Sequence, residues 1–336
     1  MKRVSSLVLV LFALASILVS ACAGQAASPL PTSRVDNIRL VGTIGPMSIP
    51  IQYMVEKNSL ASVASKTTLS IWSTPAQLQA IITGTQGDFV SLPSNAAALY
   101  YNKGIVLQYL DNSVWNILYL VTPDTAIKSV ADLKGKTVLV PYQNAVPDAM
   151  FQSLCQQSGL QPGKDITITY APDPIQASQF LLNGNAKYVL LSEPSATSVI
   201  LTGANSGMTF VRAVNVGASW RNSKDGRSVT PVAGNIVLGD IKGHPDIVKV
   251  FMAEYAKAVS WMLANPDQAG EVGARALAQQ GFTAAVLSAS SKYTEWRYVR
   301  AVDARADLED FFNTLSGVSP NFIGGKLPDN GFYFKP

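Results

Sequence analysis

The chain has 336 residues, of which 48% are hydrophobic and 14% charged, and its formal net charge is +4. Lys2 and Arg3 supply part of that charge, and the other cationic residues form no cluster, so the sequence excludes a nucleic-acid-binding footprint. There are two cysteines, Cys22 and Cys155, and no CxxC motif. A cysteine-based metal or redox motif is therefore excluded.

The first 21 residues predict a secretory signal peptide. Lys2 and Arg3 precede an apolar core, Val4 to Leu18, which is too short to span a bilayer and is followed by "VSAC" at residues 19–22. This ending resembles the lipobox of bacterial lipoproteins, so Cys22 is predicted to carry the lipid of the mature protein. Residues 22–35, rich in Ala, Ser and Pro, are then expected to form a tether. The alternative is an ordinary signal peptide with an incidental cysteine.

Short β-branched runs alternate with helical patterns from Ile38 onward, which predicts an α/β fold. "IRLVGTI", "TTLSIW" and "GDFVSL" are the first predicted strands. The helices after them are expected to start at Ser48-Ile49-Pro50, Ser73-Thr74-Pro75 and Ser94-Asn95, because Ser, Thr and Asn cap helices and proline suits the first turn. Further first-turn prolines are predicted at Pro147, Pro174, Pro194 and Pro245.

Two segments predict crossings between two lobes, one near Val121 and one near Asn235. Residues 36–121 and 235–336 are expected to form lobe 1, and residues 122–234 lobe 2, since the mature length suits two domains of ordinary size. Cys155 is expected to be a buried residue of the helix after Pro147. A regular spacing predicts an amphipathic helix that packs on a core, with Ile247, Phe251, Tyr255, Ala258 and Met262 on its buried face.

Four segments, in order, resemble solute-binding proteins of the nitrate/sulfonate/taurine (NitT/TauT) type, which serve ABC importers. They are "GDFVSLPSNAAALYYNKG", "VADLKGKTVLVPYQNAVPDAMFQSLCQQSGLQPGKDITI", "YVLLSEPSAT" and "NFIGGKLPDNGFYF". The resemblance covers most of the mature chain. It implies a type II periplasmic-binding-protein fold, in which two mixed-sheet α/β lobes joined by two crossover strands close on a small molecule. It also implies an ABC permease and its ATPase as partners.

Ligands of such sheets bind outside the carboxyl ends of strands, so the polar loops there are the predicted site. Helix N-termini at this place offer N–H groups and a partial positive charge, which suits an anion. Each Ser, Thr or Asn among the candidates has the alternative role of capping a helix, and Glu193 that of complementing a helix dipole. The candidates are Met47, Ser48, Ser73, Thr74, Ser94 and Asn95 in lobe 1 and Tyr142, Gln143, Asn144 and Glu193 in lobe 2.

The first expectation for the ligand is a small organic or inorganic anion, such as nitrate or a sulfonate. The alternative is a flat heteroaromatic molecule, such as a pyrimidine, a thiamine precursor or a flavin, which Tyr142, Trp72 and Trp115 would favour. Arg221 is either a partner for a ligand carboxylate or sulfonate or a solvated surface residue. A ligand-sensing lipoprotein without a transporter is a further alternative.

Catalytic groups are scarce in this sequence. The single histidine, His244, stands before Pro245 at a predicted helix start, and neither a Ser-His-Asp set, a metal-ligand cluster, a GxGxxG motif nor a P-loop is present. A pyrimidine-synthesising enzyme shares the implied fold. It is expected to need a histidine together with a cysteine-rich motif, a combination that this chain lacks. The sequence thus predicts a monomeric, extracytoplasmic binding protein without cofactor or metal, held to the membrane by its lipid alone.

Overall fold

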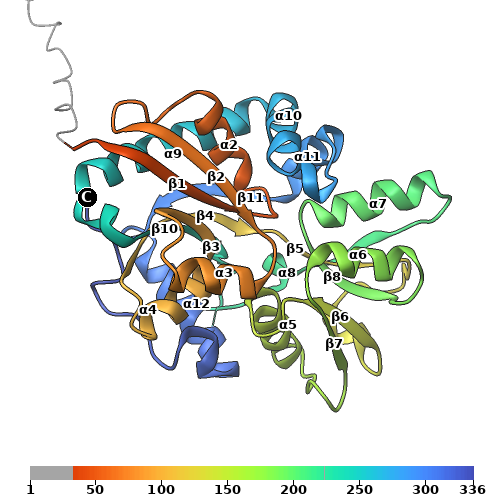
Figure 1. Ribbon diagram of the computed structural model, residues 1–336. Coiled ribbons are helices and arrows are strands. Elements are labelled where there is room, and N and C mark those ends of the chain that lie inside the picture. The colour runs from red at the N-terminus through yellow and green to blue at the C-terminus, as the bar shows by residue number, and fades with distance from the viewer. Residues whose placement is uncertain (1–32, 223) are drawn as a thin grey trace, which may run out of the picture. The chain divides into compact units, whose positions relative to one another are not determined.

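The computed structural model describes residues 33–222 and 224–336 (Figure 1). The predicted signal peptide, the lipidation at Cys22 and the tether up to residue 32 lie outside the described residues. Within the described part, no helix combines the length and the apolar character needed to cross a membrane.

The first sheet is mixed and has the strand order β11-β4-β10-β3-β1-β2. β1 pairs in parallel with β2 and β3, whereas β10 is antiparallel to β3 and β4, and β11 to β4. The predicted strands of the first hundred residues are confirmed as β1, β2 and β3. The strand bounds are β1 (Val35–Thr43), β2 (Ala64–Trp72), β3 (Phe89–Pro93), β4 (Leu107–Asn116), β10 (Ala233–Leu238) and β11 (Glu295–Arg300).

The second sheet is also mixed, with the order β7-β6-β8-β5-β9. β6 is parallel to β7 and β8, and β5 is antiparallel to β8 and β9. Only Ile117 separates β4 of the first sheet from β5 of the second, and the chain returns between β9 and β10. The lobe boundaries predicted near residues 121 and 235 fall inside β5 and β10. The strand bounds are β5 (Leu118–Thr122), β6 (Thr137–Pro141), β7 (Thr167–Ala171), β8 (Tyr188–Ser192) and β9 (Val211–Asn215).

Helices cover both faces of the first sheet, because alternate strand residues point to opposite sides. Ile38, Leu40 and Phe89 pack under α2 (Ser48–Glu56), α9 (Pro245–Ala264) and α10 (Pro266–Ala276). Val41, Val90 and Leu92 pack under α3 (Pro75–Thr83), α4 (Ser94–Asn102) and α12 (Arg305–Val318). The predicted face of α9 is confirmed, since Ile247, Phe251, Tyr255, Ala258 and Met262 are all buried.

The second sheet alternates in the same way. Val138 and Val140 face α5 (Val146–Gln157), whereas Leu139 faces α6 (Pro174–Leu182) and α7 (Ser195–Asn205). Cys155 is buried in α5, as predicted, and burial raises the pKa of its thiol to about 12. Two shorter α-helices are α8 (Val216–Ser219), after β9, and α11 (Ala284–Ser290), after α10.

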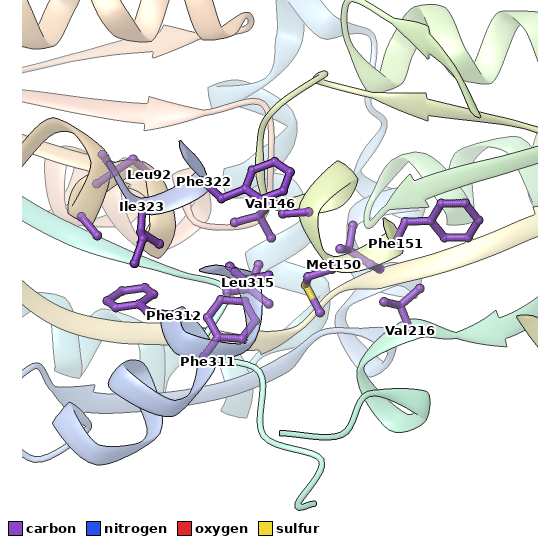
Figure 2. Packing of buried hydrophobic residues seen from close by; sticks show 14 of the residues in the cluster. Leu92, Val146, Met150, Phe151, Val216, Phe311, Phe312, Leu315, Phe322 and Ile323 are labelled. Carbon is purple, nitrogen blue, oxygen red and sulfur yellow. The ribbon is translucent and has the colours of Figure 1, made fainter. Parts of the chain in front are cut away.

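One hydrophobic cluster joins the two sheets (Figure 2). α5 of the second sheet packs against α12 of the first, and Figure 2 shows Val146 and Met150 in the same cluster as Phe311 and Leu315. Because α5 begins directly after the polar loop at residues 142–144, this packing helps to fix where the loop lies.

The predicted helix starts are partly confirmed. α3 has Thr74 as its N-cap in a capping box with Gln77, and α6 and α9 begin at Pro174 and Pro245. The N-caps of α2 and α4 are Met47 and Pro93, so the predicted starting caps Ser48 and Ser94 are instead first helical residues. Pro194 is the N-cap of α7 rather than its first residue.

Candidate functional site

A cavity of about 380 Å³ lies where strands of both sheets end. On the first sheet it is lined by the loop after β1, by Trp72 at the end of β2, and by the start of α4. On the second sheet it is lined by the loop after β6, by Pro174 after β7, by Ser192 at the end of β8, and by Glu193 after it. This is the place where open α/β sheets bind ligands.

Six of the predicted site residues line this cavity, and four do not. The residues that line it are Met47, Asn95, Tyr142, Gln143, Asn144 and Glu193. The hydroxyl groups of Ser48 and Ser94 donate to the carbonyls of Thr43 and Pro231, at 2.6 and 2.5 Å. Thr74 accepts the Gln77 N–H of the capping box, and the Ser73 N–H donates to Gln77 Oε1. The hydrogen bonds described for these four residues are therefore all made to other groups of the protein.

The loop after β6 has an unusual backbone. Tyr142 and Asn144 have φ values of +62° and +64°, in the left-handed region that residues other than glycine seldom adopt. The Asn144 N–H donates to the carboxylate of Asp148, 2.8 Å away, and Tyr170 and Gln152 donate to the other oxygen of this buried carboxylate. The first turn of α5 thus holds the loop in place, with the exposed Gln143 and Asn144 beside the cavity.

Tyr142 connects the two sheets. Its hydroxyl group donates to the carbonyl of Ser73, 2.8 Å away, which follows β2 of the first sheet. Its ring lies 6.4 Å from that of Trp72. Burial raises the pKa of Tyr142, so the phenol keeps its proton and remains a donor. The loops after β6 and β2 are therefore joined beside the cavity.

Asn95, at the start of α4, has a polar atom without a partner. Its side-chain Nδ2 donates to the carbonyl of Phe322, 2.9 Å away, and the residue is only 2% exposed. Its Oδ1 is buried and makes no hydrogen bond.

Most of the remaining lining is apolar or aromatic. Trp72 and Tyr100 contribute rings, and Leu78, Leu92, Leu99 and Val232 contribute aliphatic side chains. The sequence offered no chemical signature for most of these positions. Among the lining residues of the described chain, Lys103 is the only lysine or arginine, and it is exposed.

Three other sequence candidates lie apart from the cavity lining. Trp115 donates from Nε1 to the carbonyl of Arg297. The guanidinium of Arg297 stacks on the Trp115 ring, with 3.7 Å between the guanidinium carbon and the ring centre. Arg221 donates to the carbonyls of Ala218 and Trp220 within its own loop. His244 is the N-cap of α9 and is absent from the cavity wall.

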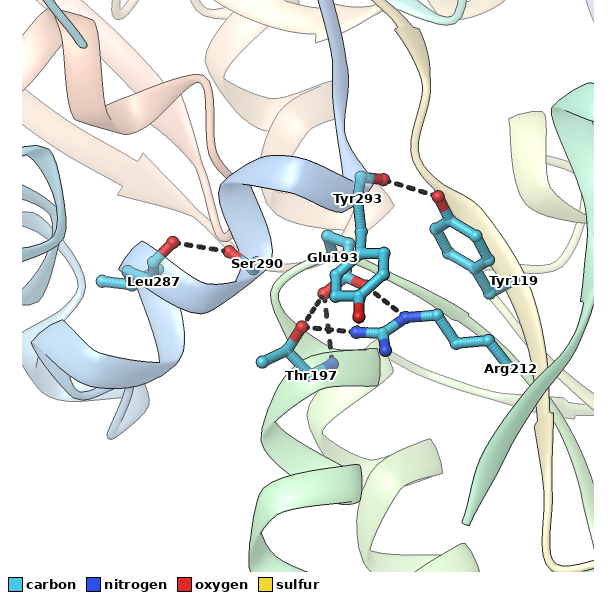
Figure 3. Close-up of polar contacts among 7 residues, drawn as sticks. All are labelled: Tyr119, Glu193, Thr197, Arg212, Leu287, Ser290 and Tyr293. Atoms are coloured by element: carbon cyan, nitrogen blue, oxygen red, sulfur yellow. Dashed lines mark hydrogen bonds and ion pairs between the residues drawn. The ribbon is translucent and has the colours of Figure 1, made fainter. Parts of the chain in front are cut away.

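Glu193 is fully engaged with protein groups (Figure 3). Arg212 donates to Oε1 from Nε and Nη2, at 2.9 and 2.7 Å, and the hydroxyl and N–H groups of Thr197 donate to Oε2, at 2.7 and 3.1 Å. Burial raises the pKa of Glu193, and the charge of Arg212 opposes that rise. Direct contact between Glu193 and a ligand stays a prediction from the sequence, and in this arrangement protein donors occupy both carboxylate oxygens.

A second hydrogen bond joins the sheets near this cluster. The Tyr119 hydroxyl of β5 donates to the carbonyl of Tyr293, 2.8 Å away, in the segment that precedes β11 (Figure 3). Nothing in the sequence pattern pointed to Arg212 or Tyr293, because their partners lie far along the chain. Throughout residues 33–222 and 224–336, no group of three or more His, Cys, Asp or Glu side chains could hold a metal ion.

The fold is that of type II periplasmic binding proteins, as the sequence predicted. An ABC transporter protein from Parabacteroides distasonis matches with a TM-score of 0.69 and 19% identity, over 90% of this chain and 99% of that one. The periplasmic aliphatic sulphonate binding protein SsuA from Escherichia coli matches with a TM-score of 0.67 and 17% identity, over 90% and 92%. The periplasmic nitrate-binding protein NrtA from Synechocystis PCC 6803 matches with a TM-score of 0.63 and 14% identity, over 84% of this chain and 85% of that one.

Residues 95–196 match the model of the NMT1/THI5-like family. The matched region starts at Asn95, passes through the Tyr142 loop and ends just after Glu193, so it contains much of the cavity wall. None of the curated protein sequences matches the chain significantly.

Proposed function

We propose that this protein is the extracytoplasmic solute-binding component of an ABC importer. The observation that carries the proposal is the cavity at the carboxyl ends of strands from both sheets, with the Tyr142 hydroxyl bonded across to Ser73. The descriptions of the structural neighbours, among them a sulphonate-binding and a nitrate-binding protein, support it. The partners are then a small solute, a permease and its ATPase.

The solute is captured by a hinge motion in this proposal. In this proposal lobe 1 comprises residues 36–121 and 235–336 and holds most of the first sheet, and lobe 2 comprises residues 122–234 and holds most of the second. β5 of the second sheet falls largely on the lobe 1 side of this boundary. The two sheets are connected by Ile117, between β4 and β5, and by the segment between β9 and β10. The bond from Tyr142 to Ser73 belongs to the closed state in this proposal. Binding shifts the lobes toward that state by the contacts that the solute makes only there.

The protein is anchored by a lipid on Cys22 in this proposal, after removal of residues 1–21. The "VSAC" ending of the apolar segment supports the anchor, and the Ala-, Ser- and Pro-rich residues 22–35 would let a monomer reach its permease. The same function without a transporter would make the protein a sensor.

Two ligand classes have support in the cavity. The N-termini of α2, α4 and α5 lie beside it and have no side-chain cap, which favours an anion such as nitrate or a sulfonate. The rings of Trp72, Tyr100 and Tyr142 favour a flat heteroaromatic solute, and a single exposed lysine is a weak counter-charge for an anion. The lining therefore supports the heteroaromatic class better.

The protein acts by binding and not by catalysis. The structural neighbours are described as transporter and binding components, and the single histidine stands at the N-cap position of α9 and does not line the cavity.

A thermal-shift screen of the protein with Cys22→Ser tests the proposal. Nitrate, ethanesulfonate, cytosine, uracil and riboflavin represent the two classes, and a solute at about 100 times its Kd raises the free energy of unfolding by about 2.7 kcal/mol. Small-angle scattering should show compaction with the same solute. The control is Gly45→Trp, since Gly45 lines the cavity and a Cβ added there makes only an ordinary van der Waals contact, 3.5 Å from the Thr43 methyl group. The proposal fails if no solute both stabilises and compacts the protein, or if Gly45→Trp responds equally.

A further inference from the structure

The two places where the chain passes between the sheets lie side by side. Asn116 is the last residue of β4 and precedes Ile117, the single residue before β5. Asn215 is the last residue of β9, and α8 begins directly after it on the way back to β10. Asn116 pairs with Glu295 of β11 in the first sheet, and Asn215 pairs with Tyr119 of β5 in the second. The two asparagines therefore stand at the points where the outward and the return crossing begin.

A hydrogen bond joins these two asparagines. Nδ2 of Asn116 donates to Oδ1 of Asn215, 2.8 Å away, although 99 positions separate them in the chain. The same oxygen accepts from the Ala218 N–H, 3.0 Å away, because Asn215 is the N-cap of α8. A backbone N–H can only donate, so Asn215 must present its oxygen here and Asn116 its nitrogen. One amide oxygen therefore connects the outward crossing to the return crossing.

The backbone of the return crossing packs directly on Asn116. Gly217 lies in α8, and a Cβ added there would be only 2.4 Å from Cγ and Oδ1 of Asn116, well inside van der Waals contact. Asn116 is buried, with 9% of its surface exposed. A side chain at position 217 would therefore have to displace the amide of Asn116 from its bond to Asn215.

This junction adjoins the cavity. Ile117 and Leu118 line it, as does Glu193. The N–H of Glu193 donates to the carbonyl of Ile117, 3.1 Å away, so the crossing residue is bonded to another part of the wall. A backbone rotation at Ile117 would therefore move the cavity wall directly.

We infer that Asn116 is a positioning residue of the hinge, whose amide holds the two crossings together and so sets how the lobes are placed around the cavity. The inference rests on the proposed hinge motion and names a residue that governs it. Hinges are formed by a few residues at the ends of elements, and Asn116 and Asn215 both end a strand. While the bond is present the crossings turn together, and without it Ile117 and the return segment can move independently.

Single-molecule energy transfer in the solute-free protein tests this inference. In the Cys22→Ser background, Lys249→Cys in α9 and Lys164→Cys between α5 and β7 accept the two dyes, because both lysines are exposed. Asn116→Leu keeps the approximate size of the side chain and removes the donor. It should broaden the distribution of dye distances and lower the ratio of the main population to all others about two- to tenfold, as the loss of one hydrogen bond implies. A distribution identical to that of the unchanged protein overturns the inference.

A glycine pair tests the same junction without removing the asparagine. Gly217→Ala should displace the Asn116 amide and broaden the distribution in the same way. Gly317→Ala is the matched control, since Gly317 is also helical, in α12, but a Cβ there would meet no atom within 4 Å. It should leave the distribution unchanged. If Gly217→Ala behaves like Gly317→Ala, the inference is wrong.

Ser91→Ala separates positioning from a general loss of stability. Ser91 is buried and donates to Oδ1 of Asn235, 2.7 Å away, so it joins two strands within the first sheet only. Ser91→Ala and Asn116→Leu should both lower the melting temperature, but only Asn116→Leu should broaden the distribution. Asn215→Asp retains the accepting oxygen and should keep the distribution of the unchanged protein. Equal broadening in Ser91→Ala, or broadening in Asn215→Asp as large as in Asn116→Leu, contradicts the inference.

The outcomes separate this inference from the proposed function, because the distance measurement needs no solute. An unchanged distribution in Asn116→Leu overturns the role of Asn116 and leaves solute binding untouched. The failure of every solute in the thermal-shift screen to stabilise and compact the protein overturns the proposed function instead.

Discussion

The guanidinium of Arg212 stacks on the ring of Tyr293, with 3.6 Å between the guanidinium carbon and the ring centre. Arg212 belongs to β9 of the second sheet, and Tyr293 to the segment just before β11 of the first. The same guanidinium is bonded to the buried carboxylate of Glu193 (Figure 3). One cation therefore neutralises a charge beside the cavity and contacts an aromatic ring across the two sheets.

Replacing Arg212 with Met should destabilise the protein strongly. The change leaves the fully buried Glu193 carboxylate without its cation, and breaking a buried pair in this way costs about 3 to 5 kcal/mol. Urea unfolding monitored by circular dichroism would measure the loss.

The double variant Arg212→Met with Glu193→Gln is the control, because it removes both charges. It should recover a large part of the lost stability. If the double variant is no more stable than Arg212→Met, the loss comes from the stacking on Tyr293 and the side-chain packing instead of the orphaned charge.

Tyr142→Phe should speed up the release of the solute. The substitution keeps the ring beside the cavity and removes only the hydrogen bond to Ser73, whose net value is about 0.5 to 1.5 kcal/mol. In the proposed hinge motion the bond forms only when the lobes close, so the effect should fall mainly on the dissociation rate, by about two- to tenfold. Stopped-flow fluorescence of Trp72 and its neighbours would report the rate.

Tyr170→Phe is the matched control for that measurement. It also removes a phenol, one that donates to Asp148, but Tyr170 does not line the cavity. Identical dissociation rates in Tyr142→Phe and the unchanged protein would show that the bond to Ser73 does not hold the closed state.

The stability difference between the protein and Asp111→Asn should depend on pH. Asp111 is fully buried in β4, and burial raises its pKa to about 7, against the hydrogen bonds from Ser113 and Asn235. A folded-state pKa above the unfolded value of about 3.9 means that the native state favours the protonated carboxyl. Its stabilising contribution is present below about pH 4 and is lost as the pH rises toward 7.

Asp111→Asn should therefore gain stability relative to the unchanged protein as the pH rises over that interval, by up to about 4 kcal/mol. Urea unfolding at both ends of the interval provides the comparison. A stability difference that stays constant with pH would show that Asp111 titrates alike in the folded and unfolded chain.

Cys22→Ser should release the protein from membranes. The prediction rests on "VSAC" after an apolar segment, and a serine hydroxyl cannot form the thioether of a lipoprotein. Fractionation of cells that express both forms measures the effect. Persistence of the serine variant in the detergent-extracted membrane fraction would contradict the lipid anchor.

The elements of the fold were predictable wherever their signal is local. Alternating β-branched runs gave β1, β2 and β3, and a proline with a preceding cap residue gave the starts of α3 and α6. Ser48 and Ser94 have the same sequence signal of an N-cap residue, but their hydroxyl groups donate to the carbonyls of Thr43 and Pro231. The acceptor for Ser94, the carbonyl of Pro231, is brought to it only by the pairing of β3 with β10.

The features of the site also separate into those with a local sequence signal and those that depend on residues far apart in the chain. The loop at Tyr142 was predictable because polar residues follow a buried strand there, whereas the role of its hydroxyl depends on Ser73 in the other sheet. At Glu193 the sequence shows a carboxylate at the start of a helix. It does not show that Arg212 forms an ion pair with this carboxylate. Apolar wall residues such as Leu92 and Val232 resemble any other core position until the sheets are assembled.

The burial of Cys155 bears on how motion in this protein can be followed. Its thiol is enclosed in α5 with a pKa of about 12, so at neutral pH it offers maleimide reagents neither access nor a thiolate. Once Cys22 is replaced, the folded chain behaves as cysteine-free toward such reagents, and the core of α5 need not be altered. Two new surface cysteines, one on each lobe, would then accept a donor and an acceptor dye for distance measurements on single molecules during binding.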